Sequence, residues 1–107
     1  MHPIADKAEI TIDFPDKLYM GGFGRDSEFE ARAEDDGLLI RLVRPGEDKR
    51  VAEIHLHHFL FAGILDELAR SLAQRGPIDV VHREPLIAAA RSFLAALEGP
   101  SVRASNG

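Results

Sequence analysis

The sequence predicts an α+β fold, in which an antiparallel four-stranded meander is packed on one face by two C-terminal helices. Two observations carry this prediction. Before residue 58, several short stretches alternate apolar and polar residues and are separated by Gly, Pro and Asp; after it, apolar residues recur at helical spacing. At 107 residues, the chain has the usual size of one domain. We expect a single domain over residues 1–99 and a flexible, polar tail over residues 100–107.

The alternation of apolar and polar residues predicts strands at 8–14, 27–34, 38–44 and 51–57. A short apolar piece at 18–20, which follows the turn at Pro15-Asp16, is a candidate fifth strand. Asp35-Asp36-Gly37 is typical of a tight hairpin, because Asp tolerates turn geometry and Gly adopts backbone angles closed to other residues. These signals together predict the meander.

The register of the meander follows from the requirement that residues directly opposite each other share a face of the sheet. This requirement pairs Ile40 with Ala31 on one side and with Ile54 on the other. It also places Arg41 between two glutamates, Glu30 and Glu53. We expect the Ile40 face to be covered by the helices and the Arg41 face to meet water.

Helical spacing predicts a first helix from about residue 59 to 74 and a second from about 83 to 98. Gly76-Pro77 and Gly99-Pro100 stand where a helix is expected to end. Propensity alone leaves open whether 80–82 forms an earlier helical turn. The first helix has a narrow polar side, which predicts that more than one flank of it is covered.

Composition limits the classes of function. Without cysteine the chain has no disulfide framework, no thiolate metal site and no cysteine nucleophile, and a cytoplasmic location is the expectation. No apolar run approaches the length of a membrane helix, and the N-terminal stretch does not resemble an export signal. The formal charge of −5 disfavours bulk affinity for nucleic acid, although a local basic patch is compatible with it.

The sequence HLHH, residues 55–58, holds three of the five histidines. In a strand, His55 and His57 project from one face about 7 Å apart, and Glu53 shares that face. Imidazole and carboxylate ligands suit zinc, nickel or iron, so Glu53, His55 and His57 are a candidate site for a divalent transition metal. Against it, the chain has no HExxH motif, and the next histidine, His82, is distant in sequence. Otherwise no cofactor is expected.

No motif points to catalysis. The serines do not occur in a GxSxG elbow, and Gly21-Gly22-Phe23-Gly24 lacks the following helix that a phosphate-binding loop requires, so it is interpreted as a turn. Paired carboxylates of a catalytic cleft are not visible in a sequence. No catalytic residue is assigned, and we expect a protein that is not an enzyme.

A predicted interaction surface consists of Leu39, Arg41, Val43 and Val51, which form an apolar and basic strip on the face expected to meet water. We therefore favour a protein-interaction or self-associating module, most simply a homodimer. An alternative is a sheet that binds single-stranded nucleic acid through these residues and Arg32, Arg44, Lys49 and Arg50, although no outward aromatic residue supplies base stacking. The metal site is the other alternative.

Overall fold

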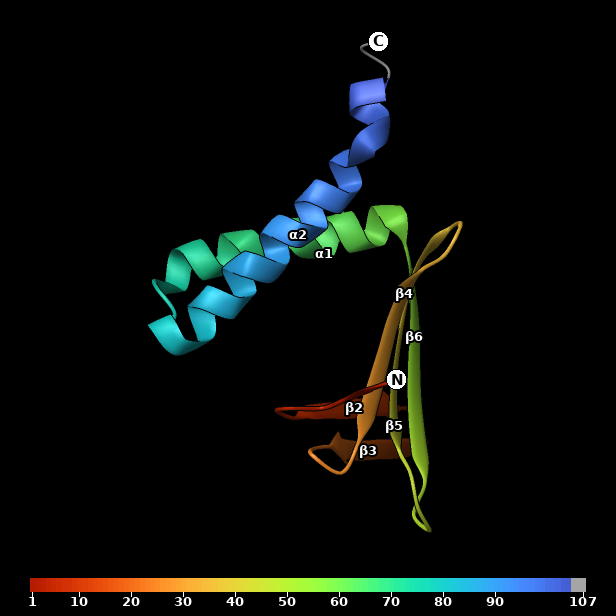
Figure 1. The fold of residues 1–107 in the computed structure, drawn as a ribbon. Coiled ribbons are helices and arrows are strands. Elements are labelled where there is room, and N and C mark those ends of the chain that lie inside the picture. Colours follow the sequence, from red (N-terminus) through yellow and green to blue (C-terminus); the bar gives the residue numbers. More distant parts are fainter. Residues whose placement is uncertain (105–107) are drawn as a thin grey trace. The chain divides into compact units, whose positions relative to one another are not determined.

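The computed structural model describes residues 1–104, with side chains as far as Gly99, and confirms the α+β class. The predicted flexible tail, 100–107, lies outside the residues whose side chains are described, and its last three residues lie outside the described backbone. The elements shown in Figure 1 are β1 (His2–Pro3), β2 (Ala8–Phe14), β3 (Lys17–Phe23), β4 (Glu28–Ala33), β5 (Gly37–Arg44), β6 (Arg50–His57), α1 (His58–Arg75) and α2 (Val80–Ala104).

The chain divides into two compact units. The first comprises residues 1–67 and contains all the described strands and the first half of α1. The second begins at Leu68 and contains the rest of α1 and α2. The packing of the two helices against the sheet stays a prediction.

The main sheet is antiparallel, with strand order β1-β4-β5-β6. Its register is the predicted one, because Ile40 lies opposite Ala31 of β4 and opposite Ile54 of β6. Arg41 is accordingly flanked by Glu30 and Glu53. The shared-face requirement was therefore sufficient to align these three strands.

The expected place of the strand at 8–14 was wrong. β2 does not join the meander but pairs along its whole length with β3 in a separate two-stranded sheet, and β1 takes the fourth position by pairing with β4. The short piece expected at 18–20 extends to seven residues as β3. A tight turn at Pro15-Asp16 joins β2 to its nearest neighbour in sequence, which is the pairing with the smallest loop-closure cost.

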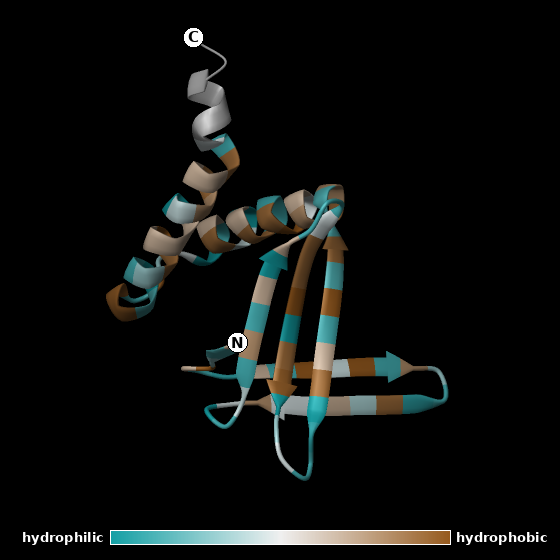
Figure 2. Cartoon of the chain, turned by 45° about the vertical axis from the view of Figure 1, so that its right-hand side comes forward, coloured by the Kyte–Doolittle hydropathy of each residue, from teal (hydrophilic) through white to brown (hydrophobic). Residues whose placement is uncertain are grey.

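The assignment of the buried face was also wrong. Leu39 and Val43 are only 6% and 9% exposed, whereas Ile54 and Phe29 on the opposite face are 43% and 36% exposed. β5 is apolar on both faces and has long neighbours on both sides, so alternation alone does not identify the face that is covered. The hairpin of β2 and β3 crosses the long strands near the ends remote from α1 (Figure 2), and β3 contacts β5.

Both helices are somewhat longer than expected. α1 begins directly after β6, and residues 80–82, left open by propensity, form the first turn of α2. Asp79 caps this turn, since its side chain accepts a hydrogen bond from the His82 amide at 3.3 Å, and hydrogen bonding with the His82 side chain lowers the pKa of Asp79. Gly99 breaks the helical backbone angles at the predicted end, and α2 resumes beyond it. Neither helix, over its described residues, is long and apolar enough to cross a membrane.

Candidate metal centre

Three side chains that are able to ligate a metal gather where the β4–β5 hairpin meets the end of β6. Asp36, His55 and His57 each offer a ligand atom, and these atoms lie within 4.8 Å of one another. The Nε2 atom of His55 lies 3.1 Å from Oδ1 of Asp36, and the His55 and His57 ring centroids are 4.9 Å apart. Ligands of a tetrahedral zinc ion, each about 2.1 Å from the metal, are about 3.4 Å from one another, so small side-chain rotations would close the site.

Gly37 makes this arrangement possible. It lies directly opposite His57 in the β5–β6 pairing, and a Cβ atom at this position would overlap the carbonyl oxygen of Leu56 and lie 2.9 Å from the Cα atom of His57. The hairpin tip is closed by a 2.8 Å hydrogen bond from the Glu34 amide to the Gly37 carbonyl. The close approach of the two strands therefore brings Asp36 beside the histidines.

The electrostatic surroundings of the cluster are acidic. Glu34 Oε1 lies 3.9 Å from His55 Nε2, and the other Glu34 oxygen accepts a hydrogen bond of 3.2 Å from Arg32 Nε. This bond is the main reason that the pKa of Arg32 is raised. The third histidine of the HLHH stretch, His58, turns to the same hairpin, where its Nε2 lies 3.4 Å from the Asp35 carbonyl oxygen. The carboxylates favour a cation at this corner, and all these groups are solvent-accessible.

The third predicted ligand, Glu53, does not belong to this group of three. Its Oε2 atom lies 3.6 Å from Arg41 Nε, and its side chain is 56% exposed. The structure thus brings together two of the three predicted ligands and adds Asp36, which the sequence analysis interpreted only as a turn residue. The signal for Asp36 was present in the register, because a strand pairing that sets Gly37 opposite His57 places the preceding residue beside that histidine.

The predicted interaction surface is not an exposed strip. Leu39 and Val43 are buried, and the expectation that they meet water is corrected; on the same face Val51 is 45% exposed, because it lies on the edge strand. The Arg41 side chain is partly exposed beside Glu53. What remains of the strip is therefore Val51 and Arg41.

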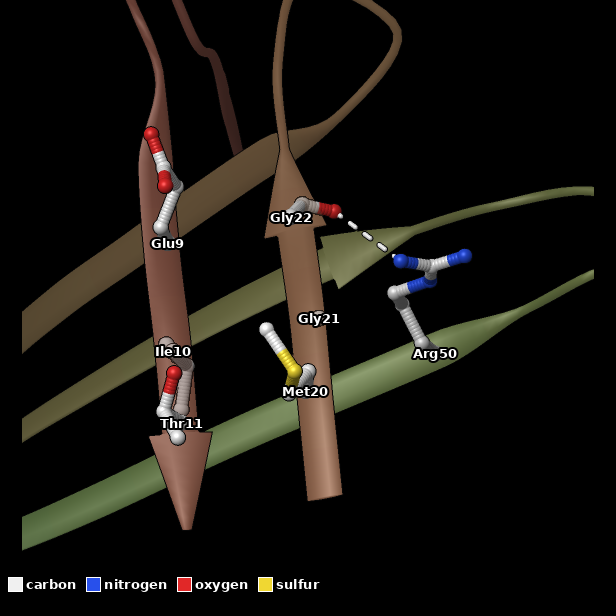
Figure 3. Close-up of a pocket in the computed structure, with 7 residues that line it drawn as sticks. All are labelled: Glu9, Ile10, Thr11, Met20, Gly21, Gly22 and Arg50. Atoms are coloured by element: carbon white, nitrogen blue, oxygen red, sulfur yellow. Dashed lines mark hydrogen bonds between the residues drawn. The ribbon is translucent and has the colours of Figure 1, made fainter. Parts of the chain in front are cut away.

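A second concave feature lies between the two sheets. A shallow groove of about 310 Å³ is lined by β2 and β3 residues and by Arg50 of β6 (Figure 3). Arg50 Nη1 donates a hydrogen bond of 3.4 Å to the Gly22 carbonyl, so its guanidinium group helps to hold β3 against β6. The groove contains one carboxylate, Glu9, and no histidine. It offers no set of groups for catalysis or metal binding.

Comparison of the chain with protein-family models, curated proteins and solved structures found no match. The site must therefore be interpreted from its own geometry. Two imidazoles and one carboxylate form a ligand set suited to zinc, nickel, copper or iron, and three protein ligands leave coordination positions open.

Proposed function

We propose that this protein binds a divalent transition-metal ion through Asp36, His55 and His57. The observation that carries the proposal is that three side chains from two separate segments of the chain hold their ligand atoms within 4.8 Å of one another. Neutral imidazole and carboxylate are the usual protein ligands of zinc and nickel, whereas magnesium and calcium prefer oxygen ligands alone. The rigid pairing of β5 with β6 reduces the entropy that would be lost on ordering the ligands.

Titration calorimetry of the untagged protein with zinc chloride and with nickel chloride tests the proposal. We expect a dissociation constant in the mid-micromolar range or tighter, and a loss of at least about tenfold in affinity for His57→Ala and for Asp36→Asn. The matched control is His82→Ala, which removes a histidine that lies outside the cluster, in α2. Absence of binding to the wild-type protein, or an equal loss in the control, would overturn the proposal.

Self-association is a second candidate function, and the edge strand β6 favours it. Val51 and Ile54, on opposite faces of this strand, are 45% and 43% exposed, and Phe59 at the start of α1 is 96% exposed. When a partner covers large apolar side chains in such positions, the free energy falls because apolar surface is removed from water. We therefore propose that the chain forms a homodimer. Light scattering that returned the 11.8 kDa of one chain at every protein concentration, with and without metal, would contradict it.

Nucleic-acid binding receives no such support. Arg32, Arg41 and Arg44 each lie within 3.6 Å of a carboxylate oxygen, and these neighbours offset the charge that would attract a phosphate backbone. We make no proposal for it.

A further inference from the structure

Strand β6 is an edge of the main sheet, and it also carries two of the three candidate metal ligands, His55 and His57. β6 is the last strand in the order β1-β4-β5-β6, so its outer backbone groups have no ladder partner among the described strands (Figure 2). It runs for eight residues, Arg50–His57, and contains neither proline nor glycine. Such an edge is a template for an added strand.

A second copy of the chain fits this edge in a limited number of ways. In a continuous antiparallel sheet with twofold symmetry, opposite residues must share a face, so the twofold axis passes through a residue of β6 and not between two residues. An axis through Glu53 or through Ile54 allows the largest number of β6 residues to pair with the partner's β6 strand. An axis at Glu53 sets this carboxylate opposite its own copy, which is repulsive.

The axis at Ile54 gives a complementary pairing. It places the exposed Ile54 side chain against the partner's Ile54, and Ala52 opposite the partner's Leu56. On the other face, it sets His55 opposite the partner's Glu53. Opposite residues in an antiparallel pair have Cβ atoms about 5 Å apart, which is within the reach of a glutamate side chain.

We infer that zinc joins two copies of this chain through their β6 strands, with the partner's Glu53 as the fourth ligand of the centre formed by Asp36, His55 and His57. The inference rests on the proposed metal binding and explains two features of Glu53. This side chain is 56% exposed, and its oxygen lies 3.6 Å from Arg41 Nε, which is beyond hydrogen-bonding distance. A surface ion pair of this kind is weak enough to yield to coordination.

The first measurement is the mass of the untagged protein by light scattering, with and without zinc chloride. We expect the mass to rise from 11.8 kDa to twice that value on addition of zinc. Glu53→Gln and Ile54→Lys should each abolish the rise, whereas the control Glu28→Gln, on the same face of β4, should leave it unchanged. Circular dichroism of each variant shows whether it keeps the fold.

The decisive measurement uses a mixture of two variants. Glu53→Gln keeps Asp36, His55 and His57, and His57→Ala keeps Glu53, so neither variant alone builds a complete centre. In a mixed dimer, the first variant receives Glu53 from the second, and one centre is complete. We expect zinc to dimerise the mixture but neither variant alone, with one zinc ion per dimer.

The outcomes separate the two proposals. If the wild-type protein binds zinc by calorimetry but keeps the mass of one chain, or if the mixture fails to dimerise, the inference is wrong and the metal site stands. A dimer that forms equally well without zinc, or with Glu53→Gln, also overturns the inference and leaves the second candidate function. If no zinc binds at all, both the site and the inference fail.

Discussion

The two faces of the sheet formed by β4, β5 and β6 differ in composition and in burial, and the face with more apolar residues is not the one that holds the most buried side chains. On one face Leu39 and Val43 are buried, and on the other Phe29 and Ile54 remain more than a third exposed. The difference shows that alternation along a strand assigns residues to two faces, and that contacts with other elements decide which face becomes the core. The candidate metal ligands His55 and His57 share the face of the buried residues.

The largest expected effect comes from truncating the buried face. Leu39→Ala should lower the free energy of unfolding by about 2–5 kcal/mol, because it removes buried methyl groups and leaves a cavity. Ile54→Ala should cost about 1 kcal/mol at protein concentrations where the chain is monomeric, because that side chain already meets water. Urea denaturation measures both values. Equal losses of stability in the two variants would show that the two faces of the sheet are buried to the same degree.

The next effect concerns the close approach of β5 and β6. Gly37→Ala should cost about 1–3 kcal/mol, because the added methyl group meets the backbone of Leu56 and His57. The same variant should bind zinc more weakly, since the strands that position the ligands must move apart. Gly22→Ala is the control, because its added Cβ atom has no neighbour within 4 Å. Comparable destabilisation of both variants in urea would contradict this account.

The dependence of zinc affinity on pH tests whether the two histidines on this face bind the metal. Imidazole ligates a metal only when it is neutral, so protons compete with the metal at His55 and His57. Affinity for zinc should fall on acidification, because metal binding to imidazole releases protons. Calorimetry at neutral and at mildly acidic pH checks this result. An affinity that did not change would indicate that carboxylates alone bind the metal.

The smallest expected effect lies in the turn before β4. The Ser27 hydroxyl donates a hydrogen bond of 3.0 Å to Asp26, and Arg44 Nε donates another of 3.0 Å; the Ser27 bond is the main reason that the pKa of Asp26 is lowered. A lowered pKa stabilises the fold above the unfolded-state value, and this contribution is lost as the pH falls through the folded value.

Asp26→Asn should therefore be slightly less stable than the wild-type protein at neutral pH, and the difference should shrink on acidification below about pH 4. Thermal unfolding at a series of pH values measures it. Asp6→Asn serves as a control, because it removes a carboxylate from an exposed position in the bend between β1 and β2. If the stability difference between Asp26→Asn and the wild-type protein grew on acidification, it would contradict the lowered pKa of Asp26.

Local patterns in the sequence were sufficient for both helices, for β2, β4, β5 and β6, and for the register of the last three strands. β1 was not predicted, and β3 was expected only as a short candidate strand. Local patterns were not sufficient where long-range contacts decide. The pairing of β2 with β3 depends on competition between neighbouring strands, and the burial of Leu39 depends on elements that lie over β5. His55 and His57 were visible as a spaced pair, but Asp36 becomes a candidate ligand only when the hairpin tip is placed beside the end of β6.

The direct passage from β6 into α1 has a consequence for how the chain tolerates insertions. Strand and helix meet at His57 and His58 with no intervening loop residue. One extra residue at this junction would leave the strand register intact but turn the following side chains of α1 by about 100° around the helix axis. The Pro45–Lys49 connection between β5 and β6 has a loop that could absorb the same insertion without altering either strand. Length variation in this protein is therefore expected at the β5–β6 loop and not at the strand-to-helix junction.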